Sequence, residues 1–124
     1  MGPLATWHHH FALAKESGYN MLHLTPLNLL GDSGSVYSIQ DQLQLNPAFF
    51  DAPLEAEAQY KAMYDTLSSA EKEYGLLAMT DVVWNHTSHT SPWLAAHPES
   101  TYNIHNSPHL LPHFQLDLVS FLFT

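Results

Sequence analysis

The polar residues with the clearest chemical potential come at the end of an almost continuously apolar run, residues 76–83. Within six positions this run releases Asp81, Asn85 and His86. Burying a carboxylate on a strand costs free energy unless the group is paired or hydrogen-bonded. Asp81 is therefore expected either to hold its own loop by accepting backbone N–H groups or to line an open binding site. The pattern alone leaves both interpretations open.

A second candidate is an aromatic residue on a loop. Tyr37 follows a turn rich in glycine and serine, residues 31–35, and precedes Asp41 and Asn46. A tyrosine presents a broad apolar ring with a polar hydroxyl, which suits stacking under a sugar. Packing is the commoner role of a loop tyrosine, so Tyr37 by itself is a weak indication.

Ten histidines raise the question of a metal site. His105, His109 and His113 are four residues apart, a spacing that could bind zinc from one face of a helix. Pro108 and Pro112 are expected to break any helix in this segment. We therefore expect a polar loop and no metal site, and the sequence indicates no cofactor.

Two similar helix–glycine–strand units must position these candidates. The first is predicted as a helix that begins at Pro3 and ends at Gly18, followed by a strand over residues 19–24. The second is predicted to begin with a helix that Asp51 caps and that holds Pro53 in its first turn. The repetition favours an α/β fold with parallel strands.

The second helix is expected to stop at Gly75, and residues 76–83 to form a strand covered on both faces. Two long loops, residues 25–50 and 84–115, follow the strands. In α/β barrels such loops carry the chemistry. Inside the second loop, Ser91 is expected to cap a short helix.

Composition excludes several kinds of partner. Three basic residues face twelve acidic ones, for a net charge of −9, whereas nucleic acid and anionic lipid require clustered Lys and Arg. No apolar run approaches the ~18 residues of a membrane span, so we expect no nucleic acid and no membrane as partner. A neutral sugar remains compatible. The lack of cysteine and of a secretory pattern favours a cytoplasmic protein.

The two candidate segments together resemble the α-amylase superfamily of glycoside hydrolases and transferases. In that superfamily one strand ends in a motif that consists of an Asp, any three residues, and then the pair Asn-His. The loop after the preceding strand carries a Tyr, with an Asp four residues on and an Asn nine residues on. Both spacings match here, at Asp81, Asn85, His86, Tyr37, Asp41 and Asn46.

A closer resemblance, over about residues 2–117, is to the glucanotransferase domain of the glycogen debranching enzyme family. It is carried by residues 14–21, 25–27, 37–38, 41–43, 45–47, 80–83, 85–87, 97–99, 102–103 and 106–110. This resemblance implies a partial TIM (β/α)8 barrel that spans about helix 1 to strand 3 and its following loop. Residues 1–124 would form one partial catalytic barrel, although residues 118–124 no longer resemble the family.

The resemblance also implies which residues bind and which chemistry is missing. Tyr37 would stack under the sugar where cleavage occurs, and His86 would hydrogen-bond its hydroxyls. Asp81 and Asn85 would hold the loop after the third strand, and Asp41 would brace the Tyr37 loop. A retaining glycosidase needs two carboxyl groups, which in this superfamily lie on strands four and five. The chain lacks those strands, so no residue is expected to be catalytic.

The implied function is therefore that of a fragment of glycogen debranching enzyme. The full protein would combine 4-α-glucanotransferase with amylo-α-1,6-glucosidase and would act on glycogen or α-glucan oligosaccharides in glycogen breakdown. The isolated chain is expected to be inactive, and whether it is an enzyme in its own right stays open. Two alternatives remain: a fragment of another α-amylase-superfamily hydrolase, or a non-catalytic glucan-binding remnant.

Overall fold

The computed structural model describes residues 2–122. They divide into two compact units, one up to Ser91 and one from Pro92 onward. The first unit contains every residue that the sequence predicts for sugar binding.

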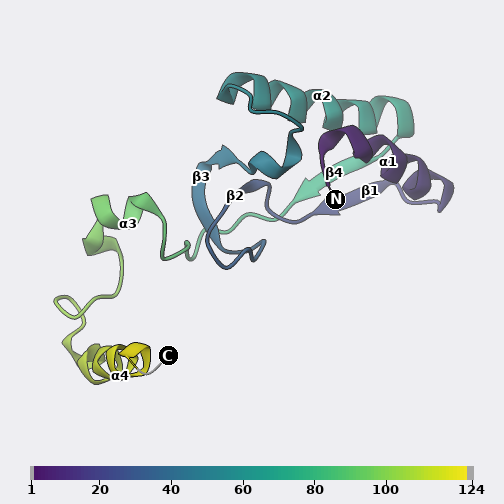
Figure 1. Cartoon of the computed structure of the whole chain (residues 1–124). Helices are drawn as coiled ribbons and strands as arrows, with labels where there is room; N and C mark the ends of the chain where they lie inside the picture. Colours follow the sequence, from purple (N-terminus) through teal and green to yellow (C-terminus); the bar gives the residue numbers. More distant parts are fainter. Residues whose placement is uncertain (1, 123–124) are drawn as a thin grey trace. The chain divides into compact units, whose positions relative to one another are not determined.

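Two parallel strands and two helices form the framework of the first unit. β1 (Met21–Leu24) pairs with β4 (Leu77–Thr80) in parallel. α1 (Trp7–Glu16) and α2 (Ala56–Tyr74) lie together on one side of this sheet (Figure 1). A short 3-10 turn, η1 (Leu4–Thr6), precedes α1. The predicted α/β arrangement of two helix–strand units with parallel strands is confirmed.

The core lies between the two helices and the covered face of the sheet. Trp7 and Phe11 of α1 are fully buried, as is Leu76 just before β4. The Trp7 ring meets Phe11 edge-on at 6.3 Å and Phe49 edge-on at 5.6 Å between ring centroids. Each such aromatic pair contributes about 0.5–1.5 kcal/mol beyond the area that it buries. Phe49 thereby anchors the segment before α2 to α1.

The end of α2 follows the prediction, but its start does not. Gly75 caps the helix with φ of 69°, a left-handed conformation that glycine adopts without a Cβ penalty. Asp51 was expected to cap the helix and Pro53 to lie in its first turn, and both expectations are wrong. The helix begins at Ala56, after an extended Glu55. Proline disfavours helical backbone in the residue before it, so a helix capped at Asp51 would need Ala52 in an unfavourable conformation.

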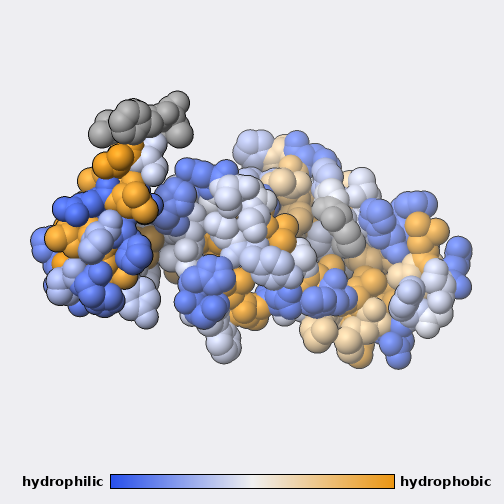
Figure 2. Space-filling view, turned by 90° about the horizontal axis from the view of Figure 1, so that it is seen from below, coloured by the Kyte–Doolittle hydropathy of each residue, from blue (hydrophilic) through white to orange (hydrophobic). Residues whose placement is uncertain are grey.

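The face of the sheet away from α1 and α2 is open. Met21, Leu77 and Met79 are 45%, 50% and 51% exposed, and Figure 2 shows hydrophobic side chains at the surface of this side of the first unit. The predicted strand over residues 76–83, covered on both faces, is therefore wrong in two respects. β4 has only four residues, and all four of them are exposed.

A β-hairpin lies where the sequence predicted a long loop, residues 25–50. β2 (Asn28–Leu30) pairs antiparallel with β3 (Ile39–Leu45), with irregular register. The 3-10 turn η2 (Pro47–Phe49) follows, and Asn46 caps it by accepting the Ala48 N–H at 3.0 Å.

The turn of this hairpin packs closely against the segment after β4. A Cβ placed on Gly31 would lie 2.0 Å from the Ser88 Oγ and 2.6 Å from its Cβ. Ser88 is buried, and its N–H donates to the Ile39 carbonyl at 2.7 Å. Glycine at position 31 therefore permits the hairpin and the post-β4 segment to approach each other.

The second unit consists of short helical segments. α3 (Pro92–Ala96) is the short helix expected after Ser91, and the 3-10 turns η3 (Pro98–Ser100) and η4 (Pro108–Leu110) follow. The last element is α4 (Leu111–Leu122).

The predicted break at Pro112 is wrong, because α4 begins one residue before it. Proline is tolerated in the first turn, where its missing N–H would have no helical partner. Of residues 118–124, α4 includes those up to Leu122, and residues 123–124 lie outside the described part. Within residues 2–122, no helix is long and apolar enough to cross a membrane.

Candidate functional site

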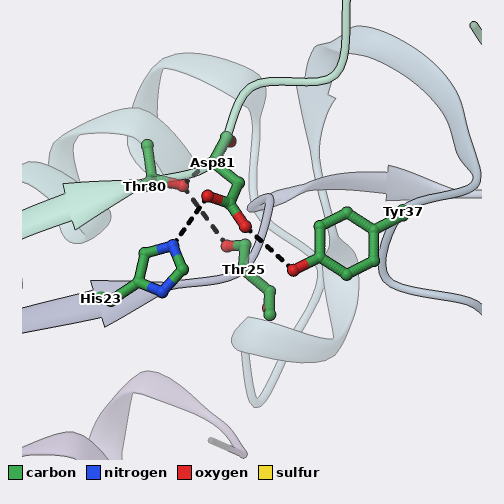
Figure 3. Close-up of polar contacts among 5 residues, drawn as sticks. All are labelled: His23, Thr25, Tyr37, Thr80 and Asp81. Carbon is green, nitrogen blue, oxygen red and sulfur yellow. Dashed lines mark hydrogen bonds and ion pairs between the residues drawn. The ribbon is translucent and has the colours of Figure 1, made fainter.

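Asp81 is the centre of a polar cluster at the end of β4. Its Oδ1 accepts a hydrogen bond from the His23 Nε2 at 2.7 Å, and its Oδ2 accepts one from the Tyr37 hydroxyl at 2.9 Å (Figure 3). The carboxylate therefore links β1, the hairpin turn and the end of β4. Within residues 2–122, the Asp81 side chain accepts no hydrogen bond from a backbone N–H of its own loop, so the first of the two interpretations of this residue is wrong.

Strand register explains why these side chains meet. His23 lies opposite Met79 in the parallel pair, and Asp81 follows two residues later. Side chains two residues apart leave the same face of a strand. His23 and Asp81 therefore both emerge on the open face. The backbone N–H of Asp81 donates to the Leu24 carbonyl at 3.1 Å, and the Thr80 hydroxyl donates to the Thr25 carbonyl at 3.4 Å.

Tyr37 is held by its side chain and by its backbone. Besides the bond from its hydroxyl to Asp81, its carbonyl oxygen lies 3.1 Å from the His86 Nε2. The Tyr37 N–H donates to the Ser35 Oγ at 3.4 Å. The side chain remains 44% exposed, so contact with a ligand does not require the phenol to give up its position.

The contacts of His86 constrain its ring and the neighbouring amide. Nε2 faces the Tyr37 carbonyl, which can only accept, so this nitrogen carries a proton. Nδ1 lies 3.0 Å from the Asn85 Oδ1. A neutral imidazole has one donor nitrogen, so it satisfies both contacts when the Asn85 amide turns its NH2 toward Nδ1.

Further bonds join the hairpin to the segment after β4. The Gln42 amide donates to the Val83 carbonyl at 2.8 Å, and the Thr87 hydroxyl donates to the Ile39 carbonyl at 2.7 Å. Together with the His86 contact, they tie the two segments at several points. The relative position of Tyr37 and His86 therefore depends on the whole hairpin.

Asp41 lies apart from the cluster. Its Oδ1 accepts the N–H of Leu43 at 2.8 Å, and its Oδ2 accepts from the Gln44 side chain at 2.7 Å. Both partners belong to β3, so these bonds stabilise the strand itself. They do not join Asp41 to the Tyr37 side chain or to Asp81.

The cluster favours fixed protonation states. The pKa of the Asp81 carboxyl is lowered, first by the hydrogen bond from His23 and then by that from Tyr37. The pKa of the Tyr37 phenol is raised, because ionisation would forfeit its hydrogen bond to Asp81 and place two negative charges together. At neutral pH Asp81 is therefore an ionised acceptor and Tyr37 a neutral donor. Neither group is suited to act as a general acid near neutral pH, because Asp81 is already ionised and the raised pKa of Tyr37 holds its proton on the phenol.

The sequence analysis missed His23. It stands in the apolar run Met21–Leu24, where a histidine is easily taken for a tolerated strand residue. A usable signal was that both strands place a polar residue on the same alternating face near their ends. Among residues 2–122, no group of three His, Cys, Asp or Glu side chains is arranged to hold a metal ion.

Comparison with known proteins gives a consistent set of relatives. Residues 1–123 match the family described as "Glycogen debranching enzyme, glucanotransferase domain". The glycogen debranching enzyme of Saccharomyces cerevisiae is 40% identical over 99 residues, which are 80% of this chain and 6% of that protein. The chain thus spans a small part of this relative's length.

Solved structures show the same likeness. An α-amylase from Lactobacillus plantarum superposes with a TM-score of 0.62 at 30% identity, over 82% of this chain and 24% of that one. A trehalose-6-phosphate hydrolase from Bacillus licheniformis superposes with a TM-score of 0.61 over 77% of this chain and 16% of that one. Its 21% identity supports similarity of fold alone.

Proposed function

The chain belongs to the glucanotransferase-domain family of glycogen debranching enzymes, and from this premise we propose that it contributes a glucan-binding surface to such a domain. The surface consists of the half-exposed Tyr37 ring, with Asp81 and the neighbouring His86 and Asn85. The ligand is glycogen or an α-glucan oligosaccharide. Asp41 supports the hairpin that carries Tyr37 by stabilising β3.

The observation that carries this proposal is the two-sided hold on Tyr37. Asp81 binds its hydroxyl and His86 binds its carbonyl, while the ring keeps access to solvent. A ring that is already fixed loses little conformational freedom when it stacks on a sugar, so more of the contact energy contributes to affinity. His86 and Asn85 supply adjacent hydrogen-bonding groups for sugar hydroxyls.

We further propose that the fold is part of a TIM (β/α)8 barrel. In this interpretation α1 and α2 are the first two barrel helices, β1 and β4 are the second and third barrel strands, and residues 1–124 form one partial domain. The parallel pairing and the helices on one face support it. The cluster also lies at the carboxyl ends of both strands, where barrel enzymes place their sites.

The complete protein, on this proposal, is a cytoplasmic 4-α-glucanotransferase and amylo-α-1,6-glucosidase of glycogen breakdown. The chain by itself transfers no glucan. Retaining glycosidases use two carboxyl groups about 5–5.5 Å apart, and in the cluster described here Asp81 is the single carboxylate, with both oxygens occupied. A low pKa also suits Asp81 poorly to protonating a leaving group.

Binding and transfer are tested on the same purified chain. Titration calorimetry with maltoheptaose is expected to show saturable binding that Tyr37→Ala abolishes. Tyr102→Ala is the matched control, because Tyr102 is a highly exposed tyrosine of the second unit. Incubation with maltoheptaose is expected to produce neither longer nor shorter glucans.

Two results would contradict the proposal. Equally weak maltoheptaose binding by the parent chain and by Tyr37→Ala would contradict the proposal that Tyr37 belongs to a glucan-binding surface. Heat-labile disproportionation of maltoheptaose by the parent chain would show that catalytic groups are present after all.

A further inference from the structure

We infer that His23 is a positioning residue of this site, which holds the Tyr37 ring in its binding orientation through Asp81. The inference rests on the proposed glucan-binding function. It adds a residue that belongs to neither of the two segments that define the family resemblance.

The geometry gives His23 a defined role. A carboxylate at the end of a strand can rotate, and a single hydrogen bond from Tyr37 leaves its orientation loosely defined. The second bond, from the His23 Nε2 to Oδ1 at 2.7 Å, fixes the carboxylate at both oxygens. Oδ2 is thereby directed at the Tyr37 hydroxyl (Figure 3).

The position of His23 on the sheet makes it a rigid support. β1 and β4 are paired over their full length, with His23 opposite Met79. Tyr37, in contrast, lies in the hairpin turn between β2 and β3. The contact through Asp81 therefore ties a loop residue to a strand, and supporting groups on regular elements position a site better than loop residues do.

The chemistry of imidazole makes the support tolerant of protonation. Nε2 carries a proton both in the cation and in the neutral tautomer that keeps its hydrogen on Nε2. Either form donates to the ionised Asp81. The imidazole therefore acts here through its shape and its N–H, with no proton transfer.

Two substitutions and one control separate positioning from general structural support. His23→Leu removes the donor, whereas His23→Gln retains an amide N–H at similar reach. His8→Leu is the control, because His8 is an exposed histidine whose Nδ1 lies 3.3 Å from the Tyr74 hydroxyl, outside the site. With ring-13C-tyrosine labelling, the Tyr37 and Tyr74 signals are followed by NMR, and maltoheptaose affinity is measured on the same samples.

The expected pattern is specific. His23→Leu shifts the Tyr37 signal and weakens maltoheptaose binding on the order of fivefold. This is less than the full loss of a hydrogen bond to a charged group, because His23 acts on the ligand only through Asp81 and Tyr37. His23→Gln restores most of both. His8→Leu shifts the Tyr74 signal and leaves affinity unchanged. Should His23→Leu fail to fold, His23→Asn replaces it, because its shorter amide does not reach Asp81.

An unchanged Tyr37 signal, or unchanged affinity, in a folded His23→Leu or His23→Asn chain would overturn the inference. A parent chain without maltoheptaose affinity would instead overturn the proposed function. In that case the Tyr37 signal still decides whether His23 positions the ring.

Discussion

At the scale of single residues, the pairing of Asp81 with Tyr37 controls how both groups titrate. The raised pKa of Tyr37 means that its stabilising hydrogen bond is fully present below the ordinary phenol value of 10.0. It is lost as pH rises through the higher value of the folded chain. The lowered pKa of Asp81 acts in the opposite range, so neither the Asp81 nor the Tyr37 ionisation is expected to change near neutral pH.

An alkaline titration tests the Tyr37 side of this pairing. Subtracting the near-ultraviolet titration curve of Tyr37→Phe from that of the parent isolates the Tyr37 phenolate. Its midpoint is expected to lie above 10.0 in the parent and to fall toward that value in Asp81→Asn, because the amide carries no negative charge. A midpoint that Asp81→Asn does not move would show that the two groups are not paired in solution.

An acid titration tests the Asp81 side. The ionised carboxylate stabilises the fold above the ordinary Asp value of 3.8, and this contribution disappears as pH falls through the lower folded value. The free energy of unfolding of the parent is therefore expected to exceed that of Asp81→Asn at neutral pH. The difference should shrink below 3.8. Urea unfolding at several pH values measures it, and a pH-independent difference would refute the paired carboxylate.

Sequence reasoning identified part of this cluster for identifiable physical reasons. Asp81 and His86 were found because polar residues directly after an apolar strand are conspicuous. Tyr37 was found by its spacing from the acidic and amide residues that follow it. His23 was missed because its partner lies 58 positions away, and only the parallel register brings the two together.

At the scale of elements, the contact between the hairpin turn and the post-β4 segment positions Tyr37. Gly31 and buried Ser88 meet where an additional Cβ would lie 2.0 Å from the serine oxygen. This contact therefore depends on the absence of a side chain at position 31, and it lies between the two segments that hold Tyr37 and His86.

Gly31→Ala is accordingly expected to destabilise the fold by about 1–3 kcal/mol through overpacking. Ser88→Gly in the same chain removes the clashing atoms and should recover part of the loss. Gly2→Ala is the control, because its Cβ would meet only ordinary contact at 3.9 Å. Chemical unfolding of Gly31→Ala, Ser88→Gly, the double variant and Gly2→Ala measures the effect. If Ser88→Gly and Gly31→Ala were simply additive, the close approach would not be the cause.

Helix ends and strand lengths show where prediction of the fold succeeded and failed. The stop at Gly75 could be predicted because a left-handed cap favours one residue type. The hairpin could not be recognised easily, since β2 has three residues and the bulged register breaks its pairing with β3. The alternation of glutamines with Ile39, Asp41, Leu43 and Leu45 was a strand signal that the long-loop interpretation overlooked.

At the scale of the whole molecule, the family assignment and the α/β class were both accessible from sequence, whereas burial was not. The prediction that both faces of β4 are covered assumed packing partners on each side of the strand. The described residues do not provide them. Whether a strand face is covered depends on segments distant in the sequence, and local apolarity cannot reveal it. An apolar run indicates that a strand can be buried, but it does not identify the segments that would cover it.

The bare face of the sheet also makes the thioethers of this chain chemically unequal. Met21 and Met79 are about half exposed there, whereas Met63 on α2 is 5% exposed. Dilute peroxide is therefore expected to convert Met21 and Met79 to sulfoxides well before Met63, as peptide mass spectrometry would show. Since Met79 lies opposite His23 and two residues before Asp81, oxidation of the methionines among residues 2–122 would begin beside the carboxylate that holds the Tyr37 hydroxyl.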